Sequence, residues 1–160
     1  MAENVVGFEG PLEAERFAGG QSNPTFRLTT PGERYVLRRK PMGALLKSAH
    51  AVDREYRVMH ALHGTGFPVP RMRALCLDDA VIGSAFYVMD HVEGRLFWDP
   101  TLPELPRGER AQIYDTMNAV IARLHLVDPG AIGLADFGRP GNYFARQIDR
   151  WTKQYRASET

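Results

Sequence analysis

The sequence predicts an α+β protein, in which an antiparallel sheet of about five strands with one packed helix precedes the first helices of an α-helical lobe. Three observations predict this class. Short strand-like runs separated by Gly, Pro and Asp turns fill most of residues 1–92. Within them, residues 48–62 carry apolar side chains at helical spacing. A proline-punctuated linker at 93–107 then precedes helical spacing over residues 108–160, so we divide the chain at these positions.

A pair of glycines lies between the first two strand-like runs. Gly19 and Gly20 allow positive φ and leave no Cβ in the way, so backbone N–H groups of Gly19 to Gln21 could close over phosphate oxygens. The Ser22 hydroxyl and the Asn23 amide would be further donors. The spacing differs from GxGxxG, and an ordinary hairpin turn would contain the same two glycines. The loop alone leaves a phosphate-binding loop and a hairpin turn open.

The next strand places a cation directly after two apolar residues. Val36 and Leu37 precede Arg38, as two apolar residues precede the phosphate-holding lysine of a VAIK strand. Arginine stays charged and offers a planar fork of donors, which suits phosphate and carboxylate together. Alternation places Arg38 on the face opposite Leu37 and Arg39, without showing which face is buried. A solvated basic strand end would have the same sequence.

A helix is predicted from Ser48 to Leu62, and Glu55 lies within its apolar stripe. A carboxylate on a buried face is costly unless a cation meets it. Arg38 is the candidate partner, and we expect the two charged groups within about 4 Å of each other. The alternative is that Glu55 lies at the edge of the stripe, solvated beside Arg54 and Arg57.

Two more strand-like runs follow, Met72 to Leu77 and Ile82 to Met89. The segment after the second run resembles the hinge of a kinase, where one backbone carbonyl and, two residues on, one backbone N–H pair with the adenine edge. By position these groups would belong to Asp90 and Val92, with Met89 as the gate residue. Because backbone groups would make the contacts, the side chains here are only loosely constrained.

Taken in order, five segments resemble the aminoglycoside phosphotransferase and choline kinase-like family, and most of all a branch related to the phosphotransferase domains fused to acyl-CoA dehydrogenases. The segments are Gly19 to Pro24, Val36 to Pro41, Val52 to Tyr56, Tyr87 to Asp90 and Gly141 to Gln147. The resemblance extends over residues 8 to 160 and implies a protein-kinase-like N-lobe with ATP and Mg²⁺ as cofactors. It implies transfer of the γ-phosphate to a hydroxyl of a small molecule. Aminoglycosides, choline-like alcohols, sugars and hydroxyacyl thioesters remain open as acceptors.

The resemblance also implies a division of roles. The nucleotide-binding set would be Gly19, Gly20, Gln21, Ser22 and Asn23 over the phosphates, Arg38 in contact with them, Glu55 orienting Arg38, and Met89, Asp90 and Val92 around the adenine. We expect no catalytic residue and no metal ligand within the chain, since the general base and the Mg²⁺ ligands should lie beyond Thr160. The chain would then be an inactive fragment. The alternative is a noncatalytic nucleotide-binding or protein-interaction module that is complete as written.

Two motifs in the second half imitate a catalytic loop. Asp136-Phe137-Gly138 matches the magnesium-binding DFG string, and His125 and Asp128 precede it. A kinase loop reads HRDxxxxN. Here two residues separate His125 from Asp128, and Gly133 stands where the asparagine should be. We therefore interpret this stretch as a connector ahead of the last helix.

Composition excludes several classes of function. A formal net charge of +1 over 160 residues gives no bulk attraction to nucleic acid or membranes. The single cysteine excludes an internal disulfide and fits a reducing compartment. With no signal-peptide pattern and no apolar run long enough to span a bilayer, we expect a cytoplasmic protein with ATP and a small acceptor as partners. The apolar stripes after Arg107 would, if uncovered, allow self-association.

Overall fold

The computed structural model describes residues 1, 4–18, 22–43, 50–139 and 141–158. The chain divides into two compact units, Met1–Val127 and Asp128–Thr160. In chain order the elements are β1 (Glu13–Arg16), β2 (Thr25–Thr29), β3 (Arg34–Arg39), α1 (Val52–His63), β4 (Met72–Cys76), β5 (Phe86–Asp90), α2 (Arg107–His125) and α3 (Tyr143–Ser158).

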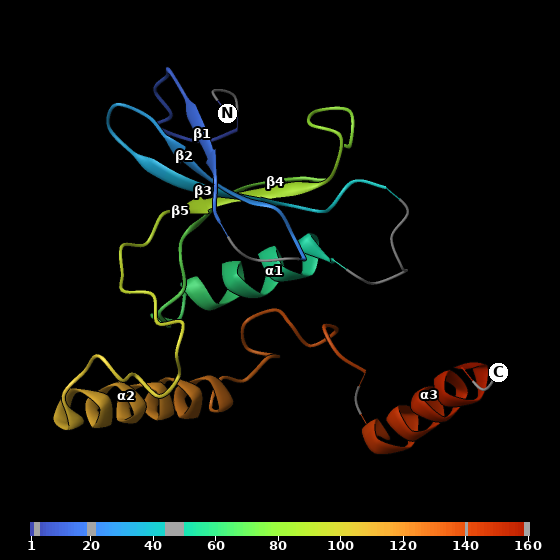
Figure 1. Cartoon of the computed structure of the whole chain (residues 1–160). Coiled ribbons are helices and arrows are strands. Elements are labelled where there is room, and N and C mark those ends of the chain that lie inside the picture. The colour runs from blue at the N-terminus through green and yellow to red at the C-terminus, as the bar shows by residue number, and fades with distance from the viewer. Residues whose placement is uncertain (2–3, 19–21, 44–49, 140, 159–160) are drawn as a thin grey trace. The chain divides into compact units, whose positions relative to one another are not determined.

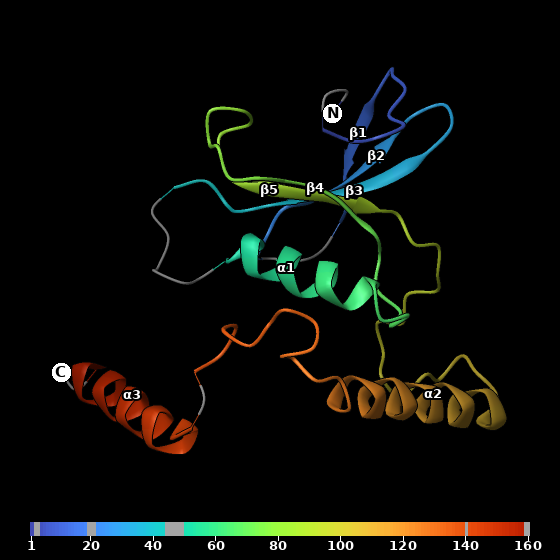
Figure 2. The same ribbon diagram turned by 180° about the vertical axis from the view of Figure 1, so that it is seen from behind.

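The five strands form one antiparallel sheet in the order β1-β2-β3-β5-β4. Helix α1 lies against one face of this sheet, as both views show (Figure 1, Figure 2). After β3, helix α1 and the loop after it lead to β4 at the edge of the sheet. Strand β5 then returns and pairs between β3 and β4. The predicted α+β fold, a kinase-like N-lobe followed by helices, is confirmed.

Strand alternation gives the sheet two buried faces. One face packs Leu28, Tyr35 and Val88 against Val5 of the N-terminal segment. The other face packs side chains of β4, β5 and the residue before β5 against Val52 of α1, and this second cluster consists of Val52, Met72, Ala85 and Tyr87. Neighbours along a strand point to opposite faces, which is why Tyr87 meets α1 while Val88 is buried on the other side.

Two predicted boundaries were wrong. The strand expected from Ile82 begins at Phe86, because Gly83 has φ +85° and takes part in a turn in which its N–H donates to the Asp79 carbonyl. The helix expected from Ser48 begins at Val52. Ser48 lies outside the described residues, and His50, with φ +59°, is not helical.

The two later helices leave apolar side chains exposed. α2 and α3 have no buried residue. The exposed large apolar side chains on α3 are Tyr143, Phe144, Ile148, Trp151 and Tyr155. α2 contacts the loop after α1 through Arg123, whose Nη2 donates to the Gly66 carbonyl at 3.1 Å. No helix in the described part of the chain combines the length and the apolar character that crossing a bilayer requires.

Val88 tests whether the sheet core holds this unit together. The side chain is fully buried in the cluster that contains Tyr35 and Leu28, so Val88→Ala should lower the free energy of unfolding by about 2 kcal/mol through lost transfer energy and a cavity. Val81→Ala is the matched control, because Val81 is 58% exposed in a turn. Urea denaturation of both variants checks the difference. Equal losses would show that Val88 does not pack as described.

Candidate functional site

The carboxylate of Glu55 accepts hydrogen bonds from three side chains that belong to different parts of the fold. Its Oε2 accepts from Nε of Arg38 at 2.8 Å and from the hydroxyl of Tyr87 at 2.9 Å. Its Oε1 accepts from Nδ2 of Asn23 at 3.1 Å. The ion pair predicted between Arg38 and Glu55 is therefore present. The alternative of a carboxylate solvated at the edge of the helix stripe does not hold for Glu55.

The sheet register explains how these side chains meet. Arg38 of β3 and Tyr87 of β5 are direct partners in the antiparallel pair, so their side chains lie side by side on one face. That face is the one against which α1 packs, since Tyr87 belongs to the cluster with Val52. Glu55 follows Val52 by three residues, nearly one helical turn, and thus points to the same side of α1.

Arg38 keeps part of its guanidinium available. Its Nη1 donates to Oγ1 of Thr25 at 3.2 Å, while Nη2 has no hydrogen-bond partner among the described residues. The Arg38 and Glu55 side chains are 31% and 34% exposed. The Glu55 carboxylate therefore orients the Arg38 guanidinium, while part of that guanidinium stays open to solvent. This arrangement suits a cation that binds an anionic ligand.

Tyr87 is a neutral donor in this network. The residue is only 2% exposed. Burial raises the pKa of the Tyr87 phenol well above its ordinary value, and the neighbouring negative charge of Glu55 raises it further. A phenol that keeps its proton can donate continuously to the carboxylate, so Tyr87 helps fix the direction in which Glu55 faces Arg38.

The glycine pair and Gln21 lie outside the described residues, and Ser22 is exposed. Asn23, at the end of this loop, is only 4% exposed. Its amide was expected to face phosphate, but in the structure it donates to Glu55, and its Oδ1 lies 2.7 Å from Nδ1 of His50. Asn23 is thus fully engaged within the lobe.

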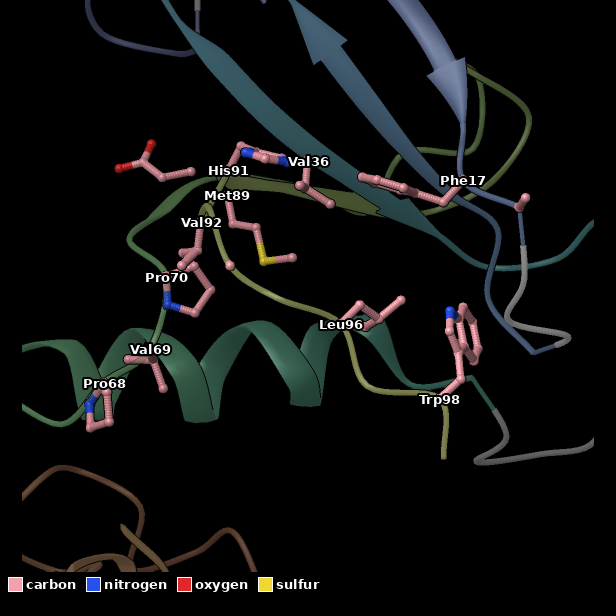
Figure 3. A pocket seen from close by; sticks show the side chains of 13 residues that line it. Phe17, Val36, Pro68, Val69, Pro70, Met89, His91, Val92, Leu96 and Trp98 are labelled. Atoms are coloured by element: carbon pink, nitrogen blue, oxygen red, sulfur yellow. The ribbon is translucent and has the colours of Figure 1, made fainter. Parts of the chain in front are cut away.

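The lobe also contains a cleft of about 720 Å³, and Figure 3 shows the side chains that line it. The cross-strand pair Val36 and Met89 contributes to its wall from the sheet. Phe17 lies just after β1, and Leu96 and Trp98 lie on the extended segment after β5. The remaining lining residues are Ala18, Pro68, Val69, Pro70, Asp90, His91, Val92 and Gly94. Mostly apolar walls with a few backbone polar groups are typical of small-molecule sites.

The predicted hinge residues Met89, Asp90 and Val92 all line this cleft. Arg73 holds the Asp90 carboxylate through two hydrogen bonds, from Nε at 2.5 Å and from Nη2 at 3.1 Å. The bond to Asp90 raises the pKa of the Arg73 guanidinium. Arg73 thus engages both oxygens of the Asp90 side chain. Val92 lies two residues beyond the end of β5, outside the strand ladder.

The structure thus places Arg38, Glu55 and Met89 on one face of the sheet, whereas the Asp90 side chain, opposite Tyr35, points to the other face. Val36 and Arg38 are two residues apart on β3 and share the first of these faces, so the cleft and the ion pair adjoin along one strand. Sequence reasoning missed the roles of Tyr87, Thr25 and His50. Alternation along β5 could have found Tyr87 once the β3–β5 register was known, whereas nothing in the sequence marks His50.

A five-stranded antiparallel sheet whose third strand carries a cation paired with a carboxylate on the packed helix defines a kinase-like N-terminal lobe. Residues 13–160 match the model of APH, the phosphotransferase enzyme family. The chain belongs to this family.

Relatives and a solved structure agree with this assignment. The chain is similar to acyl-CoA dehydrogenase family member 10 of Mus musculus, with 48% identity over 94% of the chain. It is 45% identical to acyl-CoA dehydrogenase family member 11 of Homo sapiens over 99% of the chain. The crystal structure of a Ralstonia eutropha JMP134 protein assigned to the aminoglycoside phosphotransferases superposes with a TM-score of 0.84 and 58% identity over the whole chain.

The chain spans only part of each of these proteins. It covers 14% of the mouse relative and 21% of the human one. It covers 46% of the Ralstonia eutropha chain.

The raised pKa of Tyr87 gives a pH-dependent prediction. Tyrosines of the unfolded chain ionise near pH 10, whereas folded Tyr87 keeps its proton. Above about pH 10 the unfolded state therefore binds fewer protons, and the free energy of unfolding falls as pH rises. The stabilisation is fully present below about pH 10. Tyr87→Phe lacks this titration and also loses the bond to Glu55, worth about 1–3 kcal/mol.

Urea denaturation at about pH 8 and about pH 11 checks this. Wild type should be the more stable at the lower pH, and should lose more stability than Tyr87→Phe between the two. Tyr114→Phe is the control, since Tyr114 is 43% exposed and far from Glu55 in the chain. Parallel losses in wild type and Tyr87→Phe would contradict the assignment of the raised pKa to Tyr87.

Proposed function

We propose that this chain is the nucleotide-binding part of an ATP-dependent phosphotransferase that transfers the γ-phosphate to a hydroxyl of a small molecule. The observation that carries the proposal is the Arg38–Glu55 ion pair on the same sheet face as an apolar cleft bordered by Met89 to Val92. Membership of the phosphotransferase family supports it.

The residues of the cleft fit an adenine. Val36, Met89 and Leu96 offer apolar surface for the faces of a purine ring, and Trp98 adds an aromatic side chain at the same opening. The volume, about 720 Å³, lies within the range of small-molecule sites. The backbone carbonyl of Asp90 and the N–H of Val92 would supply polar contacts at the ring edge. This proposal therefore retains the nucleotide contacts expected for these two residues.

The phosphates would meet the other half of the site. Bound ATP supplies the phosphoryl group, and Mg²⁺ neutralises charge on the phosphate oxygens. The part of Arg38 that Glu55 and Thr25 do not engage would donate to a phosphate. Glu55 and Tyr87 hold that guanidinium in one orientation. The backbone of Gly19 to Gln21, with the exposed Ser22, would cover the phosphates from the β1–β2 side.

We place the general base and the Mg²⁺ ligands beyond Thr160. This is supported by the matched Ralstonia eutropha chain, of which the present sequence covers 46%. In the described residues, no three His, Cys, Asp or Glu side chains gather so as to hold a metal ion. The curated relatives are named acyl-CoA dehydrogenases, so we include an acyl thioester that carries a hydroxyl among the proposed acceptors.

Arg38→Ala in the full-length protein tests the proposed phosphate contact. Removing a donor aimed at developing charge should lower kcat/KM by about 10²- to 10³-fold, with weaker Mg·ATP binding by calorimetry. Arg39→Ala is the matched control. It removes the same side chain from the opposite face, where Arg39 contacts Ser84 and the Ile82 carbonyl. Normal ATP affinity and turnover in Arg38→Ala, with losses in Arg39→Ala, would show that Arg39 is the phosphate ligand.

The isolated chain of residues 1–160 should bind ATP weakly at best and turn nothing over. Positioning and charge stabilisation are the main parts of phosphoryl transfer, and this chain supplies only some of them. Calorimetry and a radiolabelled phosphate-transfer assay check this, and magnesium-dependent phosphorylation of any acceptor would contradict it.

Light scattering on the same sample should show self-association, because the apolar side chains of α3 are exposed.

A further inference from the structure

The side chain of Asn23 joins parts of the lobe that are distant in sequence. It ends the loop of residues 19–23, yet it is 4% exposed and so is part of the interior. Its Nδ2 lies 3.1 Å from Oε1 of Glu55 on α1, and its Oδ1 lies 2.7 Å from Nδ1 of His50, just before α1. The described residues just before β2 are thus tied to the helix that carries Glu55.

The chemistry of Glu55 fixes the direction of these hydrogen bonds. A carboxylate paired with arginine only accepts, so the amide nitrogen of Asn23 must face it. The amide oxygen then faces His50 and must receive a proton from it. Nδ1 of His50 therefore carries hydrogen. His50 reaches this position with φ +59°, a conformation that costs a non-glycine residue about 1–2 kcal/mol, so the surrounding contacts hold it there.

A second connection closes a ring of hydrogen bonds. The hydroxyl of Thr25 donates to the backbone carbonyl of Asn23 at 3.1 Å and accepts from Nη1 of Arg38 at 3.2 Å. Arg38 donates to Glu55, which accepts from the side chain of Asn23. Asn23 thus contacts the ion pair twice, through its side chain on the Glu55 side and through its backbone on the Arg38 side.

We propose that Asn23 is a positioning residue that is coupled to the Arg38–Glu55 pair and holds this pair in the orientation that meets the phosphates. The inference rests on the proposed function. Asn23 closes the ring of hydrogen bonds that contains Arg38 and Glu55, so the orientation of the Arg38 guanidinium toward a phosphate depends on Asn23. His50 is the outer support of this coupling, since it fixes which way the Asn23 amide faces. Asn23 itself does not touch the nucleotide.

Calorimetry with Mg·ATP on the full-length protein tests the coupling. Asn23→Ala should weaken binding by about tenfold, the effect expected for losing a hydrogen bond to a charged group. Asn23→Asp keeps the shape but places a carboxylate against Glu55, so it should weaken binding further. In a Glu55→Gln background the loss from Asn23→Ala should shrink to less than about threefold, because coupled residues are not additive. Asn118→Ala, at an exposed position on α2, is the control.

His50→Ala is a second variant for the case in which Asn23→Ala does not fold. It should weaken Mg·ATP binding by about threefold, a smaller effect because the bond to Glu55 remains. The control is His63→Ala, at an exposed position at the end of α1. Circular dichroism melts identify which variants are folded at the temperature of the binding assay.

The outcomes separate this inference from the proposed function. A wild-type protein that binds no Mg·ATP overturns the proposed function and this inference with it. Normal wild-type binding together with unchanged affinity in the folded Asn23 or His50 variants overturns this inference alone. Full additivity of Asn23→Ala with Glu55→Gln also overturns it, because independent sites add and coupled sites do not.

Discussion

The site depends on one constraint, which is that the carboxylate of Glu55 faces the sheet and must be neutralised there. A charge removed from water is costly unless a counter-charge and further hydrogen bonds replace its hydration. Three donors meet this requirement, one each from β3, β5 and the loop before β2. Because those donors come from elements far apart in the chain, satisfying one carboxylate fixes the placement of α1 against the sheet.

The identity of the cation follows from this geometry. Arg38 uses Nε toward Glu55 and Nη1 toward Thr25, and a third nitrogen remains. A lysine ammonium has three donors on one rotating nitrogen, so it could contact both acceptors but would not be held in one plane by them. Arginine can therefore be held in one orientation within the lobe and still present a donor to a ligand. This planar fork distinguishes the site from the lysine of a VAIK strand.

Much of this arrangement could be predicted from the sequence, because it depends on periodicity. Alternation along β3 places Arg38 on the face opposite Leu37, and helical spacing places Glu55 beside Val52. Those two patterns predict the ion pair, although they leave open which face of β3 meets the helix. The start of β5 at Phe86 was harder to predict, because Ile82 has the character of a strand residue but lies in a run of turns over residues 79–84, in which Gly83 has a positive φ. The intrinsic preferences of glycine do not predict which glycine of a sequence will adopt a positive φ.

The parts that could not be predicted are those set by tertiary contact. Asn23 follows a glycine pair, and a solvent-facing donor for phosphate is the natural expectation for it, yet the structure buries it. Its burial depends on Glu55, which lies 32 residues away and has an oxygen left over after meeting Arg38 and Tyr87. A carboxylate has about four lone-pair sites, so the cation alone does not satisfy it. The buried amide of Asn23 thus fills acceptor capacity that Glu55 still has after Arg38 and Tyr87 are bound.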